Sequence, residues 1–183
     1  MRRIIVYIAT SADGYIARPD GDVGWLDRPE PRGGYGMNVF MRNVDTVLWG
    51  RKTHEMGREL GQTSFPGKDN YVFSRRPNRR LTPDVELVTD EVAVFARKLR
   101  RRRGKNIWLM GGADLISSFL DAGAVDELMI HVIPVLIGEG IPLTAPRHRQ
   151  LPLTLLACRT YADGVVRLHY RIQKAAESRS RSR

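Results

Sequence analysis

The chain has 183 residues, of which 42% are hydrophobic, which is enough for one compact domain with a substantial core and too many for a disordered polymer. A single cysteine, Cys158, excludes an internal disulfide, and we find neither a signal-peptide pattern nor the roughly 20 apolar residues of a membrane helix. The net charge of +10 raises the question of an anionic partner, and the composition predicts a cytoplasmic protein.

Short apolar runs rich in valine and isoleucine alternate with helical patterns along most of the chain. The runs predict strands over 4–9, 46–49, 71–73, 85–88, 107–110 and 128–133, and the helical patterns cover 36–42, 53–60, 91–103 and 114–122. This alternation indicates an α/β fold with a mostly parallel central sheet and helices on both faces.

The end of the chain differs from this pattern. Two β-rich runs, 153–161 and 165–172, are joined by Ala162, Asp163 and Gly164 and predict a C-terminal antiparallel hairpin. The last ten residues, 174–183, have no apolar periodicity, and we expect them to be disordered. We therefore expect one domain over 1–173 followed by a basic tail.

The positive charge is concentrated in two segments. Residues 97–105 include seven basic residues and no acidic one, the tail includes four basic residues and one acidic one, and the rest is neutral. We interpret the run as the solvated end of a helix that Asp90 caps at its start, because cations suit the negative end of a helix dipole. Two basic appendages differ from the broad basic face typical of nucleic-acid binding, so we do not expect a nucleic-acid partner.

A pair of glycines, Gly111 and Gly112, stands where the strand over 107–110 runs into a helical pattern. Open α/β sheets bind ligands at the carboxyl ends of their strands, and a helix start presents free N–H groups to a phosphate. Glycine there lets the backbone approach such a group closely. A tight turn without any ligand explains the pair equally well.

Two more strand ends carry residues that suit an anion. After one strand, GRKT places two cations and a hydroxyl at a helix start beginning at Gly50. After another, YVFSRRP leaves the strand with Ser74, Arg75 and Arg76. Three such ends predict a long ligand with more than one phosphate, such as a dinucleotide.

Four motifs occur in a characteristic order and spacing: IATSADGYIA, VLWGRKTHE, YVFSRR and IWLMGGADLISSFLDAGAVDELMIHVIPVLIGEGIPL. With this set the chain resembles the dihydrofolate-reductase-like superfamily, most of all the branch related to the C-terminal reductase domain of riboflavin biosynthesis proteins. The resemblance extends over 3–173 and implies a three-layer fold distinct from a Rossmann domain. It also implies NADPH as the hydride donor and a homodimer.

The resemblance further implies which residues hold NADPH. Beside the nicotinamide we expect Ala9 and Ile16. Its phosphate and ribose would lie against Gly111, Gly112, Ala113, Asp114 and Leu115. The pyrophosphate and the 2′-phosphate side would be held by Gly50, Arg51, Lys52 and Thr53. The adenosine 2′-phosphate would be framed by Ser74, Arg75 and Arg76, which favours NADPH over NADH.

The substrate side follows the family less closely. In dihydrofolate reductases an acidic residue on the helix before GRKT grips the pterin, whereas the stretch RGGYGMNVFMRN has no carboxylate, which disfavours folate. We predict Asp13 as the acid that hydrogen-bonds the substrate or relays a proton, although Asp-Gly is also a common turn signal. Trp25 and Glu139 are further candidates for substrate binding, and His54 and His131 are expected to be structural.

Three functional hypotheses remain. The first is an NADPH-dependent oxidoreductase acting on a small pyrimidinone-like or pterin-like heterocycle. The second is a family member that keeps the nucleotide site but has lost or changed its catalysis, as a regulatory or binding module. The third is a nucleic-acid-associated protein that uses the basic run and the tail. Metal and hydrolytic chemistry are not predicted, because no cluster has metal-ligand spacing and no nucleophile motif occurs.

Overall fold

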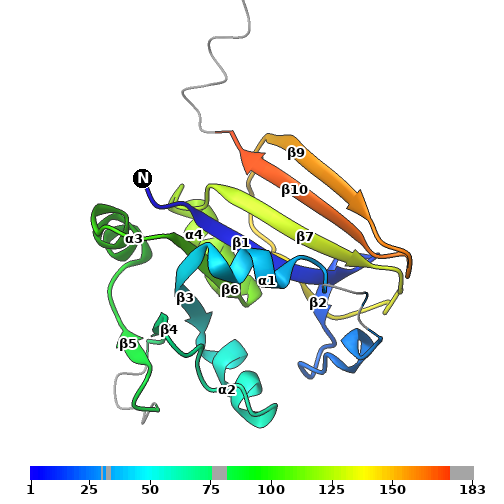
Figure 1. The fold of residues 1–183 in the computed structure, drawn as a ribbon, viewed down its shortest axis with the longest axis horizontal. Coiled ribbons are helices and arrows are strands. Elements are labelled where there is room, and N and C mark those ends of the chain that lie inside the picture. The colour runs from blue at the N-terminus through cyan, green and yellow to red at the C-terminus, as the bar shows by residue number, and fades with distance from the viewer. Residues whose placement is uncertain (30, 32–33, 76–81, 174–183) are drawn as a thin grey trace, which may run out of the picture.

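The computed structural model describes residues 1–29, 31, 34–75 and 82–173, and one eight-stranded sheet is its frame (Figure 1). In order across the sheet the strands are β5 (Glu86–Val88), β4 (Asp69–Phe73), β3 (Val44–Gly50), β6 (Asn106–Gly111), β1 (Ile4–Ser11), β7 (Glu127–Ile133), β10 (Val166–Ile172) and β9 (Leu153–Thr160). The strands from β5 to β7 in this order are parallel, and β10 and β9 continue the sheet as an antiparallel hairpin. The predicted α/β fold with its C-terminal hairpin is confirmed.

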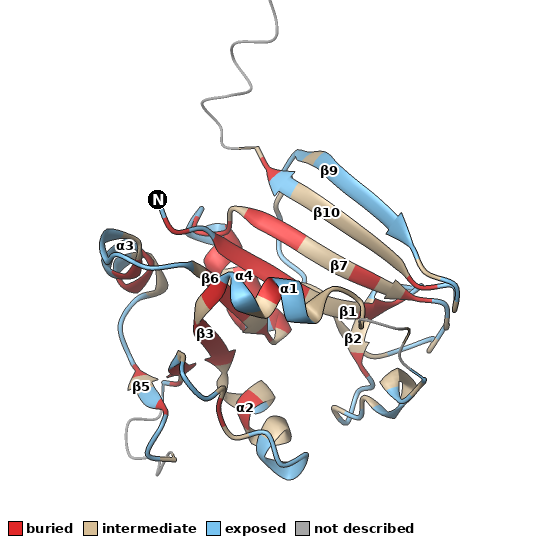
Figure 2. Cartoon of the chain, viewed as in Figure 1, coloured by how far each residue is buried: buried red, intermediate tan, exposed pale blue. Residues whose placement is uncertain are grey.

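Both faces of the parallel strands are buried, which explains their unbroken apolar sequences. In β1, Ile4 and Val6 face one side of the sheet and Ile5 and Tyr7 face the other, and all four are buried. Figure 2 shows that the buried residues gather in the central strands and on the inner faces of the helices, while β9 is largely exposed.

The described part of the chain has four α-helices: α1 (Met37–Arg42), α2 (Arg51–Glu59), α3 (Val92–Arg101) and α4 (Ala113–Asp121). Apolar side chains of α3 and α4 form one core with the first face of the sheet, and Phe40 of α1 joins the core on the other face. Helices therefore cover both faces, as predicted, and α1 and α4 lie on opposite sides in Figure 1.

The sequence predicted the C-terminal end of α4 better than the N-terminal start of α3. Helix α4 ends before Gly123, whose φ of +59° suits glycine and whose N–H donates to the Leu120 carbonyl over 3.0 Å. The prediction that Asp90 caps α3 is wrong. Glu91 is the N-cap residue and its side chain makes no capping hydrogen bond, so the helix starts one residue later than the cap pattern implied.

Three short elements escaped prediction. Strands β2 (Tyr15–Ala17) and β8 (Ile141–Pro142) pair antiparallel in a small second sheet, and a 3-10 helix, η1 (Gly24–Leu26), lies in the loop after β2. Each is too short to show a periodic pattern. The predicted tail, 174–183, lies outside the described residues. None of the described helices is long and apolar enough to span a membrane.

Candidate functional site

Two helices begin at glycines that follow neighbouring strands. Gly50 ends β3 and is the N-cap residue of α2, and Gly112 follows β6 and is the N-cap residue of α4. Neither helix start is capped by the N-cap side chain. Because β3 and β6 are parallel neighbours, both sets of first-turn N–H groups lie at one edge of the sheet, where they favour an anion.

The backbones of the two junctions approach each other closely. A Cβ atom added at Gly50 would lie 3.0 Å from both the Gly111 carbonyl oxygen and the Gly112 nitrogen. Gly111 itself has a φ of +118°, a conformation that side chains rarely adopt, and the peptide bond between Gly111 and Gly112 is cis. Close packing therefore explains glycine at position 50, and the positive φ explains it at position 111.

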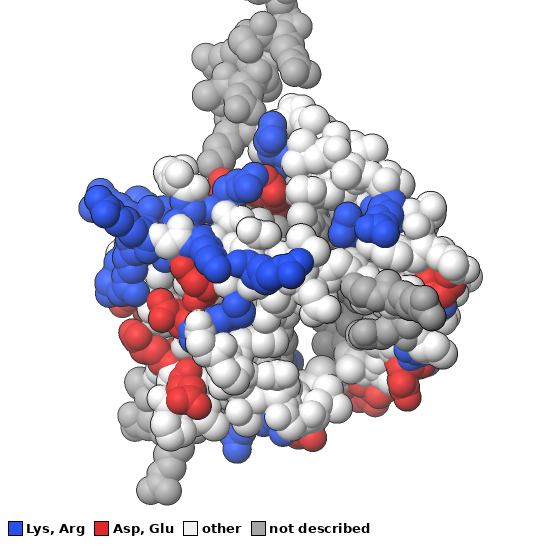
Figure 3. All heavy atoms as spheres, viewed as in Figure 1, with Lys and Arg blue, Asp and Glu red and all other residues white. Residues whose placement is uncertain are grey.

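Gly112 requires a different explanation. Its φ of −80° and ψ of −161° are accessible to any residue. A Cβ atom there would meet the Thr53 hydroxyl oxygen at 3.2 Å and Ile16 Cδ1 at 4.0 Å. A side chain at position 112 would therefore crowd Thr53, and three of the predicted cofactor residues, Gly112, Thr53 and Ile16, come together among α2, α4 and β2. The molecular surface is hollowed between α2 and β2 (Figure 3).

The cations at the start of α2 differ in their availability. Arg51 is half-buried and forms an ion pair with Glu55, one helical turn further on, over 2.8 Å. Lys52 is exposed. Of the two predicted cations, Lys52 is therefore the one whose charge stays accessible to a ligand, while Arg51 is already held on the helix surface.

The third junction lies beside the first two. Strand β4 pairs with β3, with Phe73 opposite Gly50, so the residues that follow Phe73 are placed next to the start of α2. Ser74 is buried, and its backbone N–H donates to the Val88 carbonyl over 3.1 Å, whereas Arg75 is exposed. Arg76 lies outside the described residues. The sheet order therefore brings all three predicted anion-binding junctions to one edge.

The remaining predicted cofactor residues differ in how far they are buried. Ala9 is partly buried near the carboxyl end of β1. In the first turn of α4, Ala113 and Leu115 are buried and Leu115 belongs to the core, so their backbone N–H groups are what they can offer a ligand. Asp114 is exposed.

Asp13 holds two loops together. Its carboxylate accepts hydrogen bonds from the N–H groups of Ile137, over 3.2 Å, and Gly138, over 2.8 Å. The Ser11 hydroxyl, followed by the amides of Gly138 and Ile137, holds the pKa of Asp13 below its ordinary value. An ionised, hydrogen-bonded carboxylate is a poor proton donor at neutral pH, so this geometry favours anchoring of the loop after β7 over the predicted proton relay.

The other two candidates for substrate binding are not in equivalent positions. Glu139 is exposed in the loop that Asp13 anchors. Trp25, in η1, is half-buried, and its indole Nε1 is buried without a hydrogen-bond partner among the described residues. A buried donor without an acceptor is costly, which marks this N–H as a group that a ligand could satisfy.

A network that sequence reasoning missed fixes the loop before α1 on the C-terminal hairpin. The Tyr35 carbonyl accepts hydrogen bonds from the Tyr161 hydroxyl over 2.9 Å and from His131 Nε2 over 3.1 Å. The Tyr35 hydroxyl donates to Asp163, which Arg28 also contacts. The partners are up to 135 residues apart in sequence, so no local pattern could reveal them.

Two of these groups have shifted pKa values. Burial is the largest cause that lowers the pKa of His131, so the ring is neutral at pH 7. The hydrogen bond from the Tyr35 hydroxyl is the largest cause that lowers the pKa of Asp163. His131 therefore has the structural role that was predicted for it: it donates to a loop carbonyl from within the sheet.

Comparison with known proteins gives these features a family. The model of the RibD C-terminal domain matches residues 2–167. The uncharacterised protein YwjB of Bacillus subtilis is 38% identical over 171 residues, covering 92% of this chain and 97% of YwjB. A solved protein from Shewanella sp. PV-4 that was assigned to riboflavin biosynthesis is 27% identical, with a TM-score of 0.82 over 94% of this chain and 99% of that one.

More distant solved structures share the fold. A Thermotoga maritima diaminohydroxyphosphoribosylaminopyrimidine deaminase and 5-amino-6-(5-phosphoribosylamino)uracil reductase is 18% identical, with a TM-score of 0.69 over 94% of this chain and 57% of that one. Dihydrofolate reductase from Enterococcus faecalis, solved with NADP(H), is 13% identical, with a TM-score of 0.69 over 94% of this chain and 97% of that one. The chain therefore belongs to the RibD C-terminal domain family and has the dihydrofolate-reductase-like fold.

Proposed function

We propose that this protein is an NADPH-dependent reductase that transfers a hydride to a small pyrimidinone-like or pterin-like heterocycle. The observation that carries the proposal is the place of Gly112, whose backbone conformation would accept any residue but which lies so close to Thr53 that a side chain would crowd it. Two helix starts without side-chain caps lie at this point. The fold neighbours support it, because one was solved with NADP(H) and another is a 5-amino-6-(5-phosphoribosylamino)uracil reductase.

The residues fit the cofactor at two kinds of contact. Backbone N–H groups at the starts of α2 and α4 would receive the pyrophosphate, with Lys52 adding an accessible charge and Thr53 a hydroxyl. Ser74 and Arg75 would recognise the adenosine 2′-phosphate. When bound, NADPH supplies the hydride, and the chain binds it, orients it and shields it from water.

On the substrate side, Trp25 is the strongest candidate. Its unpartnered indole N–H would donate to a carbonyl or ring nitrogen of the heterocycle. Asp13 and Glu139 lie at the contact between the loop after β1 and the loop after β7, and we assign Asp13 to positioning the loop after β7. The single cysteine and the proposed cofactor suit a reducing cytoplasm.

A second candidate function is nucleotide binding without the reductase reaction. Two observations favour it. The Asp13 carboxylate already accepts a hydrogen bond from the Gly138 N–H, and the six residues of α1 include no carboxylate that could bind a pterin. Titration with NADPH, followed through the fluorescence of Trp25, Trp49 and Trp108, tests both candidates. Turnover of pyrimidinones, dihydropterins or simple carbonyls would then support the reductase. Binding without turnover across this panel would favour the second candidate, and absence of binding would refute both.

We further propose that the protein is a homodimer formed through its C-terminal hairpin. Strand β9 is the outer strand of the eight-stranded sheet and pairs only with β10 among the described strands. It exposes leucines, including Leu155 at 53% and Leu153 at 41%. Exposure of this apolar surface to water is unfavourable, and a second copy of the chain would bury it. Light scattering at micromolar concentration should give a dimer mass, and Leu155→Lys should give a monomer. A monomer mass for the unmodified protein would contradict the proposal.

A further inference from the structure

The basic run of residues 97–105 occupies the second half of α3 and the turn into β6. The sequence contains no acidic residue between Glu91 and Asp114. Lys and Arg side chains gather on this part of the surface, over α3 and the neighbouring start of the chain (Figure 3). The run precedes β6, whereas Gly112 follows it. At about 3.3 Å per residue, the six residues of β6 separate the run from the candidate cofactor site by roughly 20 Å.

Two cations in this region are already neutralised. Arg2 is buried, forms an ion pair with Asp45, and donates through Nε to the Lys105 carbonyl over 2.8 Å. Arg100 forms an ion pair with Asp126 over 2.7 Å. These pairs hold the start of β1 and the end of α3 in place, so Arg2 and Arg100 have a structural role that requires no ligand.

Four other cations have no such explanation. Arg97, Lys98, Arg101 and Arg103 are exposed, and in the described part of the chain none of their side chains has an ion pair or a hydrogen bond. Arg97 and Arg101 are one helical turn apart, which places their attachment points about 6 Å from each other along α3. Like charges at this spacing repel each other, so the arrangement destabilises the free helix and favours an anion that bridges them.

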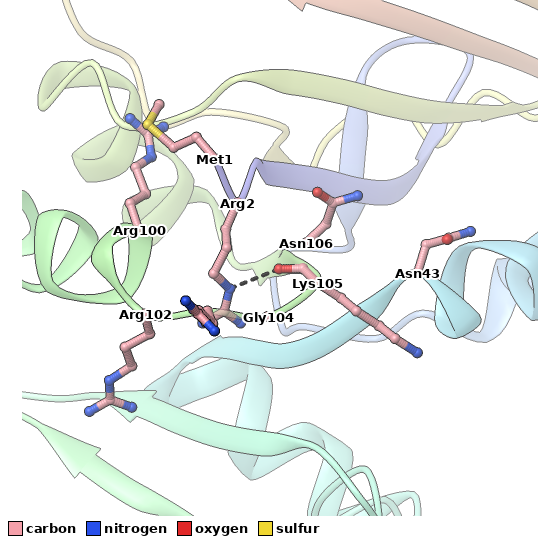
Figure 4. A pocket seen from close by; sticks show the side chains of 9 residues that line it. Met1, Arg2, Asn43, Arg100, Arg102, Gly104, Lys105 and Asn106 are labelled. Atoms are coloured by element: carbon pink, nitrogen blue, oxygen red, sulfur yellow. Dashed lines mark hydrogen bonds between the residues drawn. The ribbon is translucent and has the colours of Figure 1, made fainter.

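Two hollows adjoin these side chains. The first has a volume of about 480 Å³ and lies between the start of β1 and the turn into β6, with Arg103 and Lys105 among its walls (Figure 4). The second has a volume of about 520 Å³ and is lined along α3 by Arg97 and Arg101. Arg102 lines both hollows, and the residues lining them include neither an acidic nor an aromatic side chain.

We propose that this surface, called here the α3 basic surface and defined by Arg97, Lys98, Arg101 and Arg103 with the two hollows, binds the sugar-phosphate backbone of a nucleic-acid duplex without reading its bases. A single small phosphate would occupy only part of one hollow, whereas a row of phosphates would extend along both. Single strands are usually held by aromatic stacking, which this surface lacks.

An anionic membrane is the less suitable partner. Binding in the plane of a bilayer needs large apolar side chains beside the cations. The two hollows offer one apolar side chain each, Met1 in the first and Val94 in the second, beside at least four exposed cations. The duplex also fits better than the sequence suggested, because the fold adds the hollow at the start of β1 to a run that looked like an isolated helix end.

The test compares two variants of the full chain that lose equal charge. One carries Arg97→Gln, Arg101→Gln and Arg103→Gln, and the other carries Arg179→Gln, Arg181→Gln and Arg183→Gln in the tail. Fluorescence anisotropy with a labelled duplex of about 25 base pairs measures affinity between about 50 and 200 mM salt. For the surface variant, each lost phosphate contact should lower the slope of log K against log salt by about 0.9. If all three arginines contact phosphates, the affinity of the surface variant should therefore change about 40-fold less between 50 and 200 mM salt than the affinity of the unmodified protein.

The other outcomes are equally informative. Binding that the tail variant weakens as much as the surface variant would overturn the proposal, as would preference for vesicles containing phosphatidylserine over the duplex. Displacement of the duplex by saturating NADPH would place it at the other edge of the sheet and also overturn it. Circular dichroism checks that the triple variant is folded. If it is not, Arg97→Gln and Arg101→Gln measured singly should each lower the slope by about 0.9.

Discussion

The replacement Gly112→Ala tests the candidate cofactor site most directly. The backbone of Gly112 is compatible with alanine, and the new methyl group would meet only side-chain atoms, at 3.2 Å from the Thr53 hydroxyl and 4.0 Å from Ile16 Cδ1. A hydroxyl oxygen on a rotatable side chain can give way by a few tenths of an ångström. We therefore expect the variant to fold, with a loss of stability of at most about 1 kcal/mol, at the low end of overpacking costs.

The effect on the ligand should be much larger. One methyl group in the space between α2, α4 and β2 moves a phosphate or ribose away from the N–H groups of the helix starts. We expect NADPH affinity to fall at least tenfold, or about 1.4 kcal/mol, in a titration of tryptophan fluorescence. Gly24→Ala is a matched control, because its methyl group would also meet a side-chain oxygen at 3.2 Å, that of Asp22, but lies in η1. Unchanged affinity in folded Gly112→Ala would leave the glycine pair as a turn and remove the main support for a reductase.

Three further predictions follow from other residues of the site. Arg75→Ala should lower NADPH affinity by about 1.5 to 3 kcal/mol, which is the loss typical of a charge-assisted hydrogen bond, and should leave NADH affinity unchanged. Equal affinities of the unmodified protein for NADPH and NADH would contradict the role assigned to Arg75. Asp13→Asn should speed amide exchange at Ile137 and Gly138 while kcat changes by less than tenfold, whereas a fall of 10² to 10⁴ would identify Asp13 as a proton-transfer group. The pKa of His131 is lower in the folded protein than in the unfolded chain, so the unfolded chain takes up a proton on His131 at a higher pH than the folded protein does. The free energy of unfolding should therefore decrease as the pH falls below about 6.5. His131→Asn should reduce the difference in Tm between pH 7.5 and pH 5.5; the carboxyls of Asp13 and Asp163, whose pKa values are lowered, titrate below this range.

The sequence predicted the strands and helices that have a local apolar pattern, and it located the three strand ends that the sheet brings together. It could not separate the two glycines of the pair. Gly111 is explained by its positive φ, whereas Gly112 has an ordinary φ and lies against Thr53 and Ile16, and this distinction depends on residues from α2 and β2. Asp13 was identified from an Asp-Gly pair, but its partners lie 124 and 125 residues later, so its anchoring contact had no local signal.

The network around Tyr35 and the α3 basic surface both show that the role of a side chain depends on contacts that the sequence alone does not give. Tyr35 belongs to a glycine-rich stretch with no evident pattern, and its importance depends on a carbonyl reached from β7 and from the hairpin. The basic run was obvious in the sequence, but its meaning was not, because only the fold reveals which cations are paired and which border a hollow. Side-chain type is local information, whereas electrostatic compensation depends on neighbours that the fold supplies.

The position of β1 in the sheet has a consequence for how the protein is made. Although β1 is synthesised first, both of its neighbours come late, since it pairs with β6 from Ile107 onward and with β7 from Glu127 onward. At synthesis rates of roughly 5 to 20 residues per second, β1 waits about 5 to 20 s before its first partner strand has been synthesised. During that interval its apolar side chains on both faces are exposed on the nascent chain. This segment is therefore the part of the protein most exposed to aggregation or chaperone binding before folding is complete.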